Sequence, residues 1–194
     1  MEPVPNNKWQ PFVSIQNCFS VEECRQALKF PVTYDEATVQ RVDQGGGYEM
    51  VPEPSHRRTK VGWIKSDTAE GMNLFQKIFS ITEKCNNLVW KANIYGLEAL
   101  QLAKYEVEDG YDWHIDMWAE KASLRKLSFT VQLSVPESYE GGELEFELGS
   151  QRCVADKSRG AVTIFPSYML HRVKPITKGV RHSLVGWIVG EPYK

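Results

Sequence analysis

An unbroken alternation of apolar and polar side chains runs through Lys126–Val135. The apolar set is Leu127, Phe129, Val131, Leu133 and Val135, and the polar set is Ser128, Thr130, Gln132 and Ser134. Successive side chains of a strand point to opposite faces, so this segment is predicted to be a β-strand. A second alternating strand is predicted after Gly141-Gly142, with Leu144, Phe146 and Leu148 on one face and three glutamates opposite. Further strands are expected at 161–165, 168–174 and 180–189, separated by turns that carry Gly160, Pro166, Pro175 and Gly179.

The first half of the chain has helical rather than strand periodicity. Ser20 with Glu23, and Asp67 with Glu70, have the spacing of helix capping boxes. The second predicted helix carries one apolar stripe, formed by Leu74, Ile78, Ile81, Cys85 and Leu88. Helices followed by a run of short strands predict a mainly β fold with N-terminal helices, either a sandwich or a barrel.

Size and composition fit a single domain, 1–194, in which 98–194 form the β core and 1–97 form supporting helices and loops. The formal net charge of −2 gives no indication of a general nucleic-acid or membrane-surface binder. Met1–Gln10 lacks the apolar stretch of a signal peptide. The four cysteines form no C-x-x-C pair, which favours free thiols in a reducing, cytoplasmic setting.

The segment 40–58 contains three consecutive glycines and two prolines, and it is predicted to be a mobile loop or a hairpin. In an enzyme such a segment can be a substrate lid, and it can equally be a plain connector. His56-Arg57-Arg58 at its end is either a basic group that steers an acidic substrate or a solvated basic turn.

A candidate metal site begins with His114 and Asp116, which share one face of a strand because they are two residues apart. His171 follows much later in the chain and completes a set of two histidines and one carboxylate. Such a set leaves open positions on an octahedral ion and suits ferrous iron in oxygenases. The H-x-D pair alone is weak evidence, since a strand histidine can simply be satisfied by hydrogen bonds. Asp112 is a competing carboxylate, and His56 and His182 are not expected to be ligands.

Arg181 begins an alternating strand in which Arg181, Ser183, Val185 and Trp187 share a face. The planar guanidinium is suited to a carboxylate, because it can form two parallel hydrogen bonds with it. An inward-facing arginine on an apolar strand would be costly without such a partner. On spacing alone, a surface arginine with Trp187 in the core is an equal alternative.

Taken together and in this order, these motifs resemble the prolyl 4-hydroxylase-like branch of the 2-oxoglutarate/Fe(II)-dependent dioxygenases. The resemblance runs from Leu100 to Tyr193, about half of the chain. Its parts are Tyr-x4-Gly-Tyr before the H-x-D pair, Arg125 and the strand after it, Tyr-Glu-Gly-Gly-Glu-Leu at 139–144, Phe165-Pro166 ahead of His171, and the strand from Arg181 to Trp187.

The resemblance implies a double-stranded β-helix, or jelly roll, backed by N-terminal helices. It implies that His114, Asp116 and His171 hold Fe(II), and it favours Asp116 over Asp112. Arg181 then corresponds to the residue that pairs with the far carboxylate of 2-oxoglutarate. Tyr105, Gln132 and Trp187 correspond to further residues of the cosubstrate pocket. The cofactors implied are Fe(II), 2-oxoglutarate and O2, and a need for ascorbate stays open.

The activity implied is hydroxylation of a C–H bond, with peptidyl proline 4-hydroxylation as the first hypothesis and succinate and CO2 as coproducts. A protein or peptide is then the expected substrate. Residues that flank the expected ligands form a candidate substrate groove, namely Asp112, Trp113, Trp118, Tyr168 and Arg172. The alternatives are the same chemistry on a small molecule, lipid or nucleobase, and a non-catalytic metal-dependent binding or sensing module. The sequence leaves the oligomeric state open.

Overall fold

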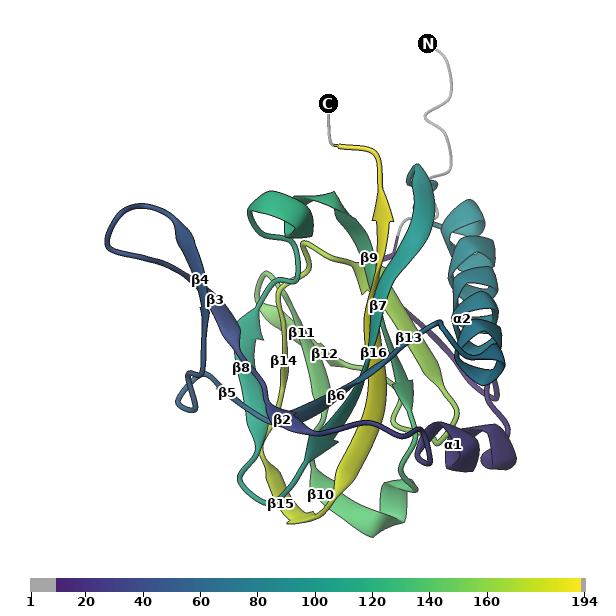
Figure 1. Cartoon of the computed structure of the whole chain (residues 1–194). Helices are drawn as coiled ribbons and strands as arrows, with labels where there is room; N and C mark the ends of the chain where they lie inside the picture. Colours follow the sequence, from purple (N-terminus) through teal and green to yellow (C-terminus); the bar gives the residue numbers. More distant parts are fainter. Residues whose placement is uncertain (1–9, 193–194) are drawn as a thin grey trace.

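Two antiparallel sheets packed face to face form most of the protein (Figure 1). The computed structural model describes residues 10–192, so Met1–Trp9 and Tyr193–Lys194 lie outside the described residues. The larger sheet has the order β1-β13-β9-β16-β7-β6-β2. Its strands are β1 (Val13–Ile15), β13 (Val162–Pro166), β9 (Arg125–Gln132), β16 (Arg181–Gly190), β7 (Ile94–Tyr105), β6 (Lys60–Ile64) and β2 (Asp35–Glu36).

The smaller sheet has five strands in the order β12-β11-β14-β8-β5. They are β12 (Gln151–Val154), β11 (Leu144–Leu148), β14 (His171–Val173), β8 (Gly110–His114) and β5 (Arg57–Arg58). Two further pairs are β10 (Tyr139–Gly141) with β15 (Ile176–Gly179), and β3 (Val39–Val42) with β4 (Tyr48–Val51). Two short 3-10 helices, η1 (Glu120–Leu124) and η2 (Pro136–Ser138), flank β9. This mainly β arrangement agrees with the predicted jelly roll.

The alternation along β9 divides its side chains between two cores. Leu127, Phe129 and Val131 belong to a core cluster that also contains Ile78 of the longer helix. Ser128 and Thr130 point the other way, between the two sheets, where Ser128 contacts Ser167 at 3.0 Å. Both faces are therefore buried, and the polar face lines the interior of the jelly roll instead of the solvent.

Two helices, α1 (Val21–Ala27) and α2 (Ala69–Leu88), pack on the outer face of the larger sheet (Figure 1). The capping box at Ser20 and Glu23 is present, with each side chain bonded to the other residue's backbone N–H. The cap predicted at Asp67 is wrong by one residue, since the Thr68 hydroxyl accepts from the Gly71 N–H.

The predicted stripe on α2 is also wrong at its last member. Ile78 and Cys85 are buried, but Leu88 is 72% exposed. The helix ends there, beyond the edge of the core that it covers. In the described part of the chain, no helix combines the length and hydropathy that a membrane span requires.

The first half of the chain contributes strands as well as helices, which the predicted division into helical support and β core did not anticipate. Strands β1, β2 and β6 join the larger sheet, and β5 joins the smaller one. The segment 40–58 contains most of the β3–β4 hairpin, which projects away from the two sheets (Figure 1). The hairpin alternative for this segment is thus confirmed.

Candidate functional site

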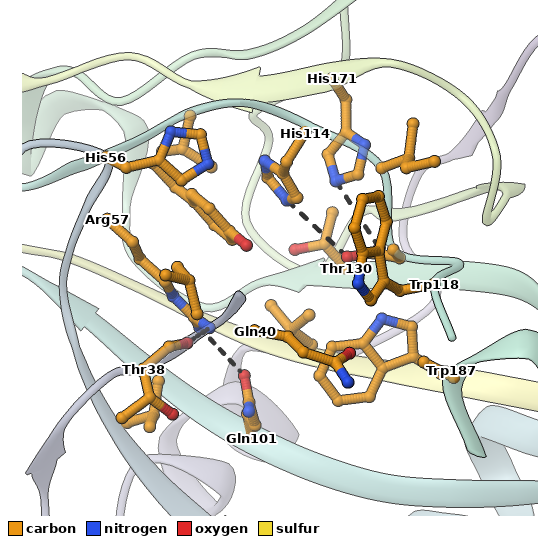
Figure 2. A pocket seen from close by; sticks show the side chains of 18 of the residues that line it. Thr38, Gln40, His56, Arg57, Gln101, His114, Trp118, Thr130, His171 and Trp187 are labelled. Carbon is orange, nitrogen blue, oxygen red and sulfur yellow. Dashed lines mark hydrogen bonds and ion pairs between the residues drawn. The ribbon is translucent and has the colours of Figure 1, made fainter. Parts of the chain in front are cut away.

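Strand pairing brings His114 and His171 together although they are 57 positions apart in the sequence. Antiparallel pairing of β8 with β14 makes the two residues direct partners. Asp116 follows β8, and its backbone N–H donates to the carbonyl of Ser167, 2.9 Å away. His114 Nε2 lies 3.7 Å from Asp116 Oδ1, and His171 Nε2 lies 3.6 Å from Asp116 Oδ2 (Figure 2). The ligand atoms of all three side chains lie within 4.8 Å of one another.

The backbone orients both imidazole rings. His114 Nδ1 lies 2.7 Å from the carbonyl oxygen of Asp112, and His171 Nδ1 lies 2.8 Å from that of Met169. A carbonyl can only accept, so each Nδ1 carries a proton, and in the neutral ring Nε2 then keeps the free lone pair. Support of this kind is usual for histidines that bind metals.

Electrostatics favour a neutral His114 beside an ionised Asp116. Burial holds the pKa of His114 well below its ordinary value, and the neighbouring His171 acts in the same direction. Burial opposes ionisation of Asp116, but His171, His114, a hydrogen bond from Ser128 and the charge of Arg125 together outweigh it and lower the pKa of this carboxyl. Two neutral imidazoles and one carboxylate are the donor set that suits Fe(II).

Asp112, the competing carboxylate, does not join this group of ligand atoms. It supplies only its backbone carbonyl to His114, while its side chain accepts from the backbone N–H of Trp113. His56 lines the neighbouring cavity but is not one of the three converging side chains. His182 lies on the face of β16 opposite to Arg181, and its backbone N–H donates to Ser134.

A cavity of about 940 Å³ opens beside the three side chains. The predicted face of β16 lines it, with Arg181, Ser183, Val185 and Trp187 all in the wall. Tyr105 is the cross-strand partner of Arg181 and also lines the cavity, with its ring 5.3 Å from the guanidinium carbon.

Arg181 is 1% exposed, and its Nε and Nη1 have no hydrogen-bond partner in the structure. Gly142 makes room for it: a Cβ on Gly142 would lie 2.9 Å from Arg181 Cδ. The hydroxyl of Tyr139 is buried and unpaired too, and Arg181 lowers the pKa of Tyr139 against the larger raising effect of burial. A buried cation with unused donors in a cavity wall has the chemistry of a carboxylate-binding group.

Gln132 is not among the residues that line this cavity, and its side-chain oxygen is buried without a partner. Thr130, two residues earlier on the same face of β9, does line the cavity and has an unpaired hydroxyl. The role expected for Gln132 stays a prediction. Thr130 is a cavity residue that sequence reasoning missed, although the alternation placed it on the correct face.

Arg125 connects the metal-binding side chains to the cavity wall. It forms two hydrogen bonds with the carboxylate of Glu98, at 2.8 and 2.9 Å, and donates to the carbonyl of Asp116 at 3.2 Å. Its guanidinium carbon lies 3.8 Å from the ring centre of Trp187. Arg125 therefore fixes the backbone of one candidate ligand relative to β16.

The candidate groove residues separate into two groups. Trp113 and Trp118 line the cavity, and Trp118 is labelled in Figure 2. Trp118 is 48% exposed. Tyr168 and Arg172 do not line it. Arg172 instead pairs with Glu145 at 2.7 Å and packs against the ring of Trp113.

The fold and the site together indicate a class of protein. A jelly roll whose strands present two histidines and one carboxylate, with open space beside them, has the arrangement of a mononuclear non-haem iron oxygenase. Residues 100–189 match the 2OG-Fe(II) oxygenase superfamily. The resemblance to the prolyl 4-hydroxylase-like branch of these enzymes is thus confirmed.

Similar proteins include PKHD-type hydroxylases. One from Synechococcus sp. (strain CC9902) is 42% identical over 97 residues, which are 50% of this chain and 44% of that protein. Another from Hyphomonas neptunium is 49% identical over 84 residues, which are 41% of this chain and 38% of that protein. The chain thus matches less than half the length of these relatives.

Solved structures extend the likeness of the fold to nearly the whole chain. A prolyl 4-hydroxylase from Pseudomonas putida has a TM-score of 0.69 at 17% identity, covering 93% of both chains. A prolyl hydroxylase from Trichoplax adhaerens, in complex with a peptide fragment of the hypoxia inducible factor oxygen degradation domain, has a TM-score of 0.72 at 20% identity. It covers 93% of this chain and 84% of that one.

Proposed function

We propose that the protein is an Fe(II)- and 2-oxoglutarate-dependent hydroxylase. The observation that carries this proposal is the arrangement of one cavity: three converging metal-ligand side chains lie beside a buried arginine with unpaired donors. His114, Asp116 and His171 would hold the iron. Arg181 would hold the far carboxylate of 2-oxoglutarate, with Tyr105 and Trp187 as walls of the same pocket.

The bound iron, with 2-oxoglutarate and O2, supplies the oxidation that hydroxylates a substrate C–H bond and yields succinate and CO2. The side chains of the protein bind and orient the reactants. The carbonyls of Asp112 and Met169 hold the two imidazoles with Nε2 toward the iron position. The apolar wall of the cavity, including Val185 and Phe165, excludes water from the reacting groups.

We further propose a peptidyl proline as the substrate. In support, the similar relatives are named PKHD-type hydroxylases, and one neighbour by fold carries a peptide. Trp113 and Trp118 offer aromatic surface beside the metal site. Tyr168 and Arg172, which do not line the cavity, would be outer contacts of a peptide. The β3–β4 hairpin contributes Val39, Gln40 and Met50 to the cavity wall and would act as the lid. In this proposal the chain acts as one domain, with 98–194 holding the site.

The test is succinate formation from 2-oxoglutarate, measured with Fe(II) and a panel of proline-containing peptides. We expect at least one peptide to stimulate turnover in the wild type, with a matching mass increase of one oxygen atom. His114→Ala should abolish succinate formation. If iron-dependent succinate is absent from the wild type as well, the protein is a binding or sensing module. If only a small molecule, lipid or nucleobase stimulates turnover, the proline substrate is wrong.

Metal binding offers a matched control for the ligand assignment. Asp116→Asn should weaken Fe(II) binding strongly, because it removes the carboxylate from the donor set. Asp112→Asn should leave Fe(II) affinity nearly unchanged, since Asp112 contributes only a backbone carbonyl. Equal losses in the two variants would contradict the assignment of Asp116.

A further inference from the structure

Two neighbouring arginines of β5, Arg57 and Arg58, point in opposite directions. Arg58 faces outward and pairs with Glu108 at 3.3 Å and Asp109 at 3.4 Å. Arg57 lines the same cavity as the metal-ligand side chains (Figure 2). The basic turn expected from the sequence is therefore solvated only at Arg58.

The guanidinium of Arg57 is held by neutral groups alone. Nη1 donates to the carbonyl of Thr38 at 3.1 Å, and Nη2 donates to Gln101 Oε1 at 3.3 Å. Its Nε is buried and has no partner. Among the ion pairs of residues 10–192, none involves Arg57. A guanidinium has five N–H donors, so the half-buried Arg57 side chain keeps donors that no carboxylate of the described residues uses.

Arg57 lies close to the metal site, on a different wall from Arg181. Its guanidinium carbon is 4.6 Å from the ring centre of Tyr111, and that ring stacks on His114 at 3.4 Å. Only one aromatic ring therefore separates Arg57 from a candidate iron ligand. Arg181 instead begins β16 and packs against Tyr105.

Four arginines line the cavity, and two of them have carboxylate partners: Arg41 pairs with Glu53 and Arg125 with Glu98. Arg57 and Arg181 have none among the described residues, and the cosubstrate accounts for one of these two.

We propose that Arg57, with Gln101 beside it, forms a subsite for a carboxylate of the substrate. This inference rests on the proposed function and adds the substrate class to it: a molecule with a carboxylate near the carbon that is hydroxylated. The carboxylate belongs either to an acidic side chain beside the target residue of a peptide or to the α-carboxylate of a free amino acid. Gln40 of the hairpin lines the same cavity and offers a further amide to the substrate.

The test uses two matched pairs of probes. The peptide pair contains one proline and differs only in a glutamate or glutamine next to it. The small pair is L-proline and L-prolinamide. Binding is measured by calorimetry without oxygen, on protein loaded with Fe(II) and 2-oxoglutarate, after binding of 2-oxoglutarate itself has been measured.

We expect the carboxylate member of one pair to bind about tenfold more tightly than its amide, since a hydrogen bond to a charged group is stronger than one to a neutral group. Arg57→Gln should remove this preference by weakening only the carboxylate member, and Arg57→Lys should retain part of it. Arg58→Gln, the matched control, should retain all of it. A preference in the peptide pair identifies an acidic peptide, and a preference in the small pair identifies an amino acid.

Two results would overturn the subsite. One is the absence of a preference in both pairs, including the absence of binding by all four probes. The other is an equal loss for both members of a pair in Arg57→Gln, which would mean that Arg57 acts only through Tyr111 on His114. In either case normal binding of 2-oxoglutarate leaves the proposed function intact, whereas failure to bind Fe(II) and 2-oxoglutarate counts against that function.

Discussion

At the scale of single residues, charges buried without partners distinguish ligand contacts from structural contacts. Arg125 and Arg172 are arginines near the cavity that have carboxylate partners within the protein, Glu98 and Glu145. These two side chains hold neighbouring elements together. Arg181 has no such partner, and its position is costly for the protein alone. A residue of this kind is expected to lower stability until its ligand binds.

Arg181→Met separates the effect of Arg181 on stability from its effect on cosubstrate binding. Without 2-oxoglutarate, the variant should melt at the same temperature as the wild type or higher, since an unpaired buried charge is removed. Its affinity for 2-oxoglutarate should fall about 100-fold, the loss expected when charge-assisted hydrogen bonds worth about 3 kcal/mol disappear. Thermal shift assays with and without the cosubstrate measure both quantities. A large loss of melting temperature without ligand would instead indicate a structural role.

His182 gives a pH-dependent prediction. Burial lowers the pKa of its imidazole below 6.5, and Lys104 and Arg181 act in the same direction against Glu106. The unfolded chain therefore binds a proton first as the pH falls below 6.5, and stability decreases until the pH passes the lowered pKa of the folded state. His182→Asn should lose less stability over this range. The check is the free energy of unfolding of both proteins from about pH 8 to about pH 5. A constant difference between them would contradict the prediction.

At the scale of elements, alternation predicted which side chains share a face, and long-range pairing determined what each face meets. The common face of Arg181, Ser183, Val185 and Trp187 follows from period two alone, and it is the cavity wall. The position of Arg57 could not be predicted in this way, because β5 has only two residues and its direction depends on pairing with Tyr111. The stripe of α2 failed at Leu88 for a similar reason: periodicity does not reveal where the partner sheet ends.

Two positions on α2 test this account of the helix. Ile78 is 1% exposed and packs against the larger sheet, so Ile78→Ala should lower the free energy of unfolding by about 2–5 kcal/mol. Leu88→Ala, in the same helix and the same predicted stripe, should change it by less than about 0.5 kcal/mol. Urea denaturation of both variants measures the difference. Similar losses at the two positions would show that the end of α2 is also part of the core.

At the scale of the whole molecule, the two sheets supply the metal and cosubstrate residues. The hairpin adds a cavity wall that belongs to neither sheet. The three candidate metal ligands lie on and beside β8 and β14 of the smaller sheet, and Arg181 begins β16 of the larger one. Strands β3 and β4 pair only with each other. Three apolar side chains on the hairpin, Val42, Tyr48 and Met50, are more than 40% exposed. The hairpin therefore has apolar surface available for a substrate without being part of either sheet.

Replacing 40–50 by a short glycine linker tests whether the sheets hold the cosubstrate while the hairpin contacts the substrate. We expect binding of 2-oxoglutarate to stay within about twofold of the wild type, since the sheets hold its residues, whereas substrate-stimulated succinate formation should fall about tenfold or more through loss of substrate contacts. The control shortens only the turn at 43–47 to Asn-Gly, which preserves the pairing of β3 with β4 and should preserve most stimulation. Calorimetry and succinate assays give the two readouts. Loss of 2-oxoglutarate binding in the linker variant would mean that the hairpin supports the cosubstrate pocket, and unchanged stimulation would mean that it is a plain connector.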